Sequence, residues 1–329
     1  MDVFLPLRKR TTPLIKRTLE ISQESVHLAV QLDQLRLTRN GSEVGLLATM
    51  PCEDIGLVVV DNPGTTYSHA ALARLIDFGA AVVICGKNHL PSGLLLPMSS
   101  HTELVPRLHD QIAVSKPVRK KLWAQIVVAK VRAQARNLDA GYVAHARLLA
   151  LANQVKSGDP TNVEAQAARI YWSEWLDAQV PEETSPGTTA ANVFRRDHDG
   201  GDIVNAMLNY GYAVLRAAVG RAIVSAGLQP ALGLMHSNRS NAFCLADDLM
   251  EPLRPLVDRA ARDLYREGAV ELNRAVKSKL LTLLTATVRV DGQTGPLMVS
   301  LHRTVASLVR CYQGEEKRLL LPEEVDEAE

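Results

Sequence analysis

The hydrophobic pattern of the chain changes near residue 100, and this change constrains the fold more than any other feature. Before it, short runs of β-branched or alternating apolar residues are separated by turn signals such as Arg39-Asn40-Gly41. After Ser99-Ser100-His101, most segments place apolar residues at helical spacing, as far as about residue 310. We therefore expect an α+β chain, with a strand-rich domain over residues 1–100 and a larger all-α domain over residues 101–329.

The expected elements follow from this pattern. A helix is expected from Tyr67 to Phe78, between runs of strand character at 14–22, 26–38, 44–49, 55–60, 80–85 and 93–97. Further helices are expected at 103–113, 116–137, 140–156, 161–179, 202–226, 243–267, 269–286 and 298–313. A short β-ribbon is possible at 285–293, and the acidic tail at 321–329 is expected to be frayed.

Composition indicates a globular protein. The 329 residues suffice for two domains with a sizeable core, and 47% of them are hydrophobic while 22% are charged. No leader peptide and no run of about 18 apolar residues is visible, so a soluble, cytoplasmic protein is expected without a membrane partner. The cysteines are widely spaced, which argues against a zinc ribbon or a disulfide framework; they are Cys52, Cys85, Cys244 and Cys311.

The charge of the chain is close to balanced, but its distribution is uneven. A net charge of +1 mildly disfavours a nucleic-acid partner. Residues 111–138, however, contain no acid and seven basic residues. This stretch is either a phosphate-binding surface or a solvated helix face that is balanced by acids elsewhere.

Glu164 is the first candidate for chemistry. On a helix it would project on the same face as Ala167, Tyr171 and Trp175, where a buried carboxylate needs a partner such as a divalent metal ion. The local sequence also fits a capping box, Thr161-x-x-Glu164, in which the carboxylate returns to the backbone at the start of the helix. Taken alone, the segment favours capping.

A second candidate is an acid-rich helix that is interrupted by prolines. Asp247, Asp248, Glu251 and Asp258 fall on one flank of the helix expected at 243–267, where like charges repel unless a cation lies between them. Two prolines, at 252 and 255, interrupt the hydrogen bonds to the carbonyl groups of residues 248 and 251. A metal site and simple neutralisation by Arg254 and Arg259 are equally compatible with this pattern.

His236 lies in a polar loop just before that helix. A lone histidine is usually a surface or core residue with one hydrogen bond, but this loop can bring His236 over Asp248 and Glu251. An imidazole with carboxylates suits Mg²⁺ or Mn²⁺.

Two rival functions stay open. His109-Asp110 and His198-Asp199 are HD dipeptides, and His198-Asp199 with His145 and a later aspartate could form the site of a helical HD-type metal phosphohydrolase, although residues 195–202 are glycine-rich and loop-like. Alternatively, the chain is a non-enzymatic helical module that binds DNA or protein, in which Glu164 caps its helix and the acids pair with arginines.

Several segments, in order and spacing, resemble those of a known family. They are NVEAQAARIYW, VNAMLNYGYAVLRAAVGRAI, GLQPALGLMH and FCLADDLMEPLRPLVDR, with KKLWAQIVVAKVRAQA and SGLLLPMSS before them. Together they are similar to the CRISPR-associated spacer-acquisition integrases, the larger of the two universal adaptation proteins, in their type II form. The resemblance implies an N-terminal β-sandwich, with roles in dimerisation and DNA-end binding, joined to an all-helical catalytic domain.

The resemblance also implies an active site. Glu164, His236 and Glu251 would bind catalytic Mg²⁺ or Mn²⁺, and Asp248 would be the supporting acid, with Asp247 a less favoured substitute. The ion would polarise a DNA phosphate for attack by a 3′-hydroxyl, and nuclease activity would use water instead.

The partners that the resemblance implies are nucleic acid and protein. They are double-stranded DNA (protospacer and CRISPR repeat), a second copy of the chain, a small ferredoxin-like companion subunit and the type II effector nuclease. The basic stretch supplies Lys120, Lys121, Lys130 and Arg132 as expected contacts to the DNA backbone.

Overall fold

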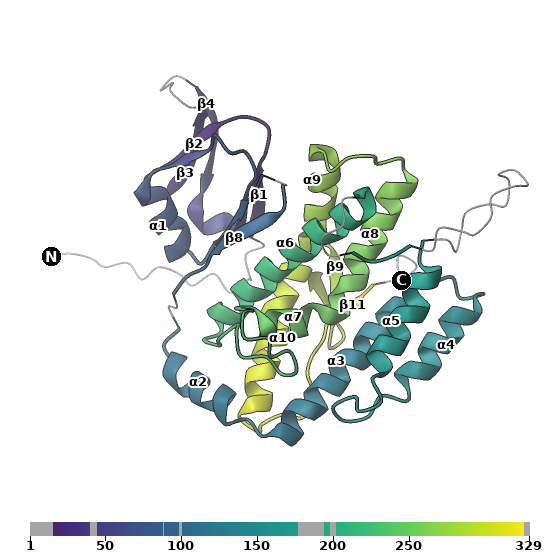
Figure 1. Cartoon of the computed structure of the whole chain (residues 1–329). Coiled ribbons are helices and arrows are strands. Elements are labelled where there is room, and N and C mark those ends of the chain that lie inside the picture. Colours follow the sequence, from purple (N-terminus) through teal and green to yellow (C-terminus); the bar gives the residue numbers. More distant parts are fainter. Residues whose placement is uncertain are drawn as a thin grey trace, which may run out of the picture.

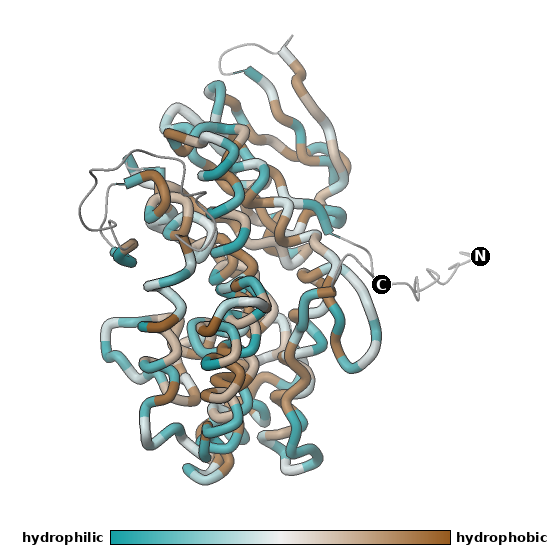
Figure 2. Tube along the Cα trace, turned by 90° about the vertical axis from the view of Figure 1, so that its right-hand side faces the viewer, coloured by the Kyte–Doolittle hydropathy of each residue, from teal (hydrophilic) through white to brown (hydrophobic). Residues whose placement is uncertain are grey.

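A computed structural model of the chain describes residues 16–39, 45–87, 89–98, 101–176, 194–197 and 202–325. It is a mixed α+β structure in which the strands come first and a larger helical region follows (Figure 1). Hydrophilic and hydrophobic residues alternate along the helices and strands (Figure 2). No helix among these residues has the length and apolar character needed to cross a bilayer.

The N-terminal part contains two four-stranded sheets. The strands are β1 (Arg17–Ile21), β2 (Val26–Gln31), β3 (Gln34–Arg39), β4 (Leu46–Pro51), β5 (Ile55–Val60), β6 (Thr66–Tyr67), β7 (Ala81–Cys85) and β8 (Pro91–Leu95). One sheet has the order β1-β5-β7-β8 and the other β4-β3-β2-β6. A short 3₁₀ turn, η1 (Cys52–Asp54), precedes β5, and the expected helix is α1 (His69–Asp77).

The run expected at 26–38 is two strands and not one. Leu32 and Asp33 have φ angles of 49° and 62° and form a tight turn between β2 and β3. Such a two-residue turn needs positive φ at both positions and is usually marked by Asn-Gly. Because Leu-Asp carries no such mark, the turn was not visible in the sequence. The register pairs Leu28 with Leu37, which places apolar side chains of both strands on the inner face.

The remainder is mainly helical. The helices are α2 (Leu104–Ala113), α3 (Lys116–Arg136), α4 (Val143–Ala152), α5 (Val163–Glu174), α6 (Ile203–Ser225), α7 (Cys244–Met250), α8 (Arg254–Arg266), α9 (Arg274–Thr282) and α10 (Leu297–Tyr312). Two 3₁₀ turns, η2 (Glu251–Leu253) and η3 (Leu283–Thr285), follow α7 and α9.

A small antiparallel sheet departs from the all-α expectation for this region. The possible ribbon is present as β9 (Thr287–Val290) and β10 (Gln293–Pro296), which turn at Asp291 and Gly292 with positive φ. The acidic segment expected to be frayed adds a third strand, β11 (Glu323–Glu324), paired with β9. Glu324 also forms an ion pair with Arg259 of α8 at 2.6 Å. Residues 326–329 lie outside the described part.

Strand β5 joins the two parts of the chain. All six of its residues are buried, because successive side chains face two different cores. Val58 and Val60 belong to the smaller core between the N-terminal sheets, whereas Leu57 and Val59 belong to the large core of the helical region. The long helix α6 contacts both β7 and β8. The domain boundary near residue 100 stays a prediction, and Ser99 and Ser100 are not among the described residues.

Candidate active site

Glu164 lies in the first turn of α5, but it does not cap that helix. Asp159 accepts hydrogen bonds from the backbone N–H groups of Val163 (2.8 Å) and Glu164 (3.0 Å). The side chain of Asn162, with a left-handed φ of 52°, accepts from Ala165. These two residues satisfy the N–H groups at the start of the helix, so the carboxylate of Glu164 is free to bind elsewhere. The capping-box interpretation is therefore wrong.

Glu251 is presented by a break in the acid-rich helix. The segment expected as one helix is divided into α7, η2 and α8, and Glu251 is the first residue of η2, directly before Pro252. A proline cannot donate a backbone hydrogen bond, so the α-helical pattern cannot continue through this position. The interruption that the two prolines indicated is present. Glu251 is 4% exposed and packs against α3.

The ammonium group of Lys130 lies between these two carboxylates. Its Nζ is 2.6 Å from Oε1 of Glu164 and 2.6 Å from Oε2 of Glu251, so the two oxygens lie within twice that distance of each other. Arg254 donates to the other oxygen of Glu251 at 2.9 Å. Burial by itself would raise the pKa of Glu251, but Lys130 and Arg254 outweigh it and hold that pKa below its ordinary value. Glu251 is thus an anion at neutral pH.

His236 is oriented by a buried aspartate. Asp248 is fully buried and accepts backbone N–H groups from Leu234 (2.6 Å), Met235 (3.1 Å) and His236 (3.2 Å). Its Oδ1 is 2.6 Å from Nδ1 of His236, and this hydrogen bond raises the pKa of the imidazole. Nδ1 is thereby occupied, so Nε2 is the nitrogen through which His236 could bind a metal ion.

The remaining two acids of the helix face other partners. Asp247 pairs with Arg216 at 2.7 Å and accepts from Asn241 at 2.6 Å. Asp258 accepts from the hydroxyl groups of Tyr171, at 2.9 Å, and Tyr212. Of the two arginines considered as neutralising partners, Arg254 pairs with Glu251, whereas Arg259 pairs with Glu324 of β11.

The structure therefore brings Glu164 and Glu251 together, with His236 close enough for its charge to interact with both. Two carboxylates and one imidazole are donors that fit Mg²⁺ or Mn²⁺ in kind. As they stand, however, no group of three or more His, Cys, Asp or Glu side chains in the described ranges is arranged to hold a metal ion. The carboxylates are engaged by Lys130 instead.

The role of Lys130 was not recognised from the sequence. The basic stretch grouped it with Lys120, Lys121 and Arg132 as a contact to DNA, but its side chain is only 13% exposed, whereas those three residues are exposed. A signal existed, because Lys130 lies three or four positions from the apolar residues Ile126 and Val127 and so falls on the inner face of its helix. Its acidic partners could not be identified in this way.

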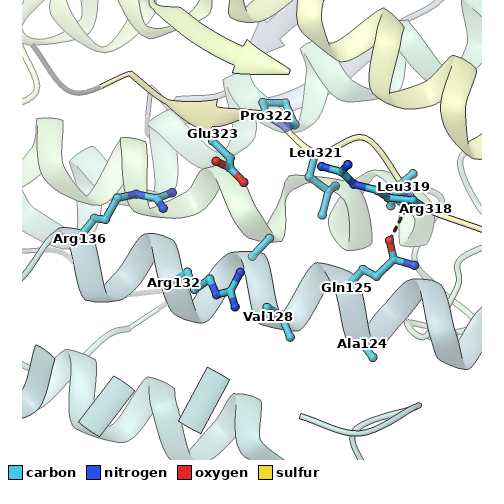
Figure 3. Close-up of a pocket in the computed structure, with 11 residues that line it drawn as sticks. Ala124, Gln125, Val128, Arg132, Arg136, Arg318, Leu319, Leu321, Pro322 and Glu323 are labelled. Carbon is cyan, nitrogen blue, oxygen red and sulfur yellow. Dashed lines mark hydrogen bonds between the residues drawn. The ribbon is translucent and has the colours of Figure 1, made fainter. Parts of the chain in front are cut away.

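The opposite side of α3 forms one wall of a basic groove of about 320 Å³. Arg132 and Arg136 extend from α3, one turn apart, and Arg318 lies on the segment that follows α10 (Figure 3). Glu323 of β11 is the acid among the lining residues. The side chain of Gln125 holds this segment against α3 through the backbone of Lys317 and Leu319.

His109 and His145, which were considered for an HD-type phosphohydrolase, have other surroundings. His109 lies on the exposed side of α2, and Nδ1 of His145 is 2.9 Å from the carbonyl oxygen of Ala135, so that histidine has a structural partner. His198 and Asp199 lie outside the described residues.

Comparisons with known proteins identify the family. The family model described as CRISPR associated protein Cas1 matches residues 19–290. The chain is 35% identical to the CRISPR-associated endonuclease Cas1 of Neisseria meningitidis serogroup C over 306 residues, which cover 92% of this chain and 94% of the relative.

Two solved structures share the fold. One is a casposase bound to an integration product, with a TM-score of 0.72, 22% identity and 92% of each chain covered. The other is a Cas6-RT-Cas1–Cas2 complex, with a TM-score of 0.74 and 17% identity; the match covers 98% of this chain and 38% of that one. The match to the family model and the full-length relative together place the chain in the Cas1 family of CRISPR-associated endonucleases.

Proposed function

We propose that this enzyme inserts protospacer DNA into a CRISPR repeat by metal-dependent transfer of a phosphodiester to a 3′-hydroxyl. The observation that carries the proposal is the convergence of Glu164 and Glu251 on a single cation beside His236. The family provides the reaction class, and the casposase bound to an integration product supports transfer as well as cleavage. With water as the nucleophile, the same chemistry is endonuclease activity.

The residues of the site have distinct tasks in this mechanism. Glu164 and Glu251 would supply oxygen ligands to Mg²⁺ or Mn²⁺, and His236 would supply Nε2. A bound divalent ion would polarise the scissile phosphate and neutralise the charge that develops on its non-bridging oxygens. Asp248 orients His236 and is fully buried inside the fold. The burial of Glu251 limits the access of water to its carboxylate.

The substrate is proposed to be double-stranded DNA, bound in part by α3. Lys120 and Lys121 are exposed at the N-terminal half of this helix, and Arg132 lines the basic groove with Arg136 and Arg318. These residues would contact phosphates and contribute affinity without sequence information. Lys130 is not part of this surface, because its ammonium is held between two carboxylates.

Protein partners are proposed by analogy. A structural neighbour is a complex that contains Cas1 and Cas2, which supports assembly with a small ferredoxin-like companion subunit. We propose that the chain acts as a homodimer through its N-terminal β-sandwich, with the type II effector nuclease as a further partner. We place the enzyme in the cytoplasm, where its DNA substrates would be.

The test is strand transfer of a short duplex into a repeat-bearing plasmid, with Mn²⁺ and the companion subunit present. Glu164→Gln and His236→Asn should each lower transfer roughly a hundredfold or more, because each removes a ligand to the ion. Glu174→Gln, on the same helix but outside the cluster, is the matched control and should retain activity. Full activity of Glu164→Gln, or loss of activity only in His198→Asn, would reject this site.

A further inference from the structure

Lys130 is a largely buried cation, with its side chain 13% exposed, in the position where the site is proposed to accept a metal ion. Its Nζ bridges Glu164 and Glu251 at 2.6 Å each, and the side chain of Glu251 is only 6% exposed. Lys130 reaches this point from the inner face of α3, among Ile126, Val127 and Val131, all of them buried. The ammonium therefore neutralises two carboxylates that would otherwise repel each other.

The ammonium and a divalent ion cannot both use the same oxygen atoms. Mg²⁺ binds carboxylate oxygens at about 2.0–2.1 Å and needs an ordered shell of ligands around it. With Lys130 and Arg254 in place, the charges of Glu164 and Glu251 are already balanced. Adding a divalent ion would leave two excess positive charges in a partly buried cluster, and this is unfavourable unless one cation departs.

Lys130 is the cation that can leave. Arg254 donates to Oε1 of Glu251, and its guanidinium lies over the ring of Tyr212, 4.7 Å from the centroid, so a second contact fixes its position. Both ion pairs of Lys130 are with the two proposed metal ligands. Its side chain is a flexible four-carbon stem, which can swing the ammonium away without moving the helix.

We propose that Lys130 is an internal counter-ion that holds Glu164 and Glu251 together until a divalent metal ion displaces it. This rests on the proposed function, because it assumes that these two carboxylates bind the ion. Lys130 is thus a positioning residue that keeps the ligands paired in the metal-free protein, and it weakens metal binding by competing with the ion. The affinity of the enzyme for Mn²⁺ therefore includes the free-energy cost of displacing the Lys130 ammonium from the two carboxylates.

The test is Mn²⁺ binding by the full chain without DNA, measured by calorimetry and by electron paramagnetic resonance. Lys130→Met keeps the length of the side chain and removes its charge. This variant should bind Mn²⁺ about tenfold more tightly or better than the wild type, because no cation has to be displaced. Without metal it should unfold at a lower temperature than the wild type, and Mn²⁺ should restore more of its stability.

Two further variants make the result specific. Lys156→Met, which removes an exposed lysine in the loop before α5, should leave Mn²⁺ binding unchanged. Lys130→Arg keeps the charge and should bind Mn²⁺ no more tightly than the wild type. If Lys130→Met does not fold, a crystal structure of the wild type with Mn²⁺ decides the question, because Nζ of Lys130 must then have left the space between the carboxylates.

The outcomes separate this inference from the proposed function. Mn²⁺ binding that Glu164→Gln abolishes, but that Lys130→Met leaves unchanged or weakens, would overturn the counter-ion role and retain the metal site. A metal-bound structure in which Lys130 still bridges both carboxylates would overturn it as well. If Glu164→Gln binds Mn²⁺ as the wild type does, the proposed metal site itself is wrong.

Discussion

A fully buried aspartate controls the imidazole of the site. Asp248 accepts three backbone N–H groups and faces Nδ1 of His236, so it fixes both the loop and the direction of Nε2. Partners of this kind, behind a metal ligand, typically contribute 10- to 100-fold in metal affinity or activity. The acid therefore acts through His236.

The substitution Asp248→Asn should test this role. The new amide would keep one acceptor oxygen but would present its NH₂ group to backbone N–H donors, so His236 would lose its orientation. We expect a roughly 10- to 100-fold drop in Mn²⁺ affinity and in strand transfer. The measurement is calorimetry beside the transfer assay, with Asp263→Asn on the exposed side of α8 as the control. Unaltered Mn²⁺ affinity in a folded Asp248→Asn protein would contradict the assignment.

The sequence singled out the residues of the candidate site, but not the partners that the structure gives them. Glu164, His236 and Glu251 could be singled out because carboxylates and a histidine stood where an apolar face or a helix break made them unusual. Lys130 could not, because its partners lie 34 and 121 positions away along the chain. Local spacing also favoured the capping of α5 by Glu164, and only the fold shows that Asp159 and Asn162 take that role.

Three helices behind the site are joined by one buried carboxyl group. Asp258 of α8 accepts the hydroxyl groups of Tyr171 on α5 and Tyr212 on α6. Asn137, at the end of α3, donates to the hydroxyl of Tyr171 and to the carbonyl of Pro255. Burial raises the pKa of Asp258 to about 7, against the opposing effect of the two tyrosine hydrogen bonds. The network thus contains an acid that changes charge near neutral pH.

This raised pKa predicts how the stability of the helical region depends on pH. In the unfolded chain Asp258 ionises near its ordinary value of 3.8, whereas in the folded chain it keeps its proton up to about pH 7. Between pH 3.8 and about pH 7, unfolding therefore releases a proton from Asp258. The free energy of unfolding falls by up to about 1.4 kcal/mol for each unit that the pH rises in this range. The stability that protonated Asp258 contributes to the folded state is fully present below its unfolded pKa of 3.8. This contribution is lost as the pH rises to about 7.

Asp258→Asn should remove this dependence. From pH 5 to pH 8 the free energy of unfolding of the wild type should fall by about 2–3 kcal/mol more than that of the variant. Urea unfolding at the two pH values gives the difference, and Asp263→Asn, which alters an exposed acid on the same helix, should behave as the wild type. Equal slopes for the wild type and Asp258→Asn would mean that Asp258 is ionised throughout.

Sequence patterns predicted helix breaks and turns correctly where the signal was local. The break before α8 follows from Pro252, and the turn between β9 and β10 follows from Asp291-Gly292. The turn at Leu32-Asp33 was missed because leucine rarely adopts positive φ and no glycine marks the turn. Strand β11 was missed because its pairing with β9 depends on a segment more than 30 residues earlier.

The two parts of the molecule are held together by more than apolar packing. Lys277 of α9 and Asp61, which follows β5, form an ion pair in which both side chains are at most 5% exposed. Nδ1 of His89 is 3.0 Å from the other oxygen of Asp61, and the ammonium of Lys277 lies over the ring of Tyr210, 5.8 Å from its centroid. The change in hydrophobic period predicted two parts, but no local pattern indicated that they share buried charges.

Removing one partner of this pair should destabilise the junction between the strands and the helices. Lys277→Met would remove the ammonium that faces the buried carboxylate of Asp61, and we expect a loss of about 3–5 kcal/mol in the free energy of unfolding. Lys279→Met is the matched control on the same helix, because its partner Glu267 is 59% exposed and such surface pairs contribute less than about 1 kcal/mol.

The double variant Lys277→Met/Asp61→Asn separates charge burial from packing. With the buried carboxylate neutralised, most of the stability that Lys277→Met loses should return, since the larger part of the cost is an uncompensated charge and not a missing contact. Denaturant unfolding of the four proteins forms a complete thermodynamic cycle. If the two losses simply add, the pair does not couple the N-terminal sheets to α9, and the junction depends on other contacts, such as the apolar contacts of β5 and the hydrogen bond from Arg221 to the carbonyl of Gly79.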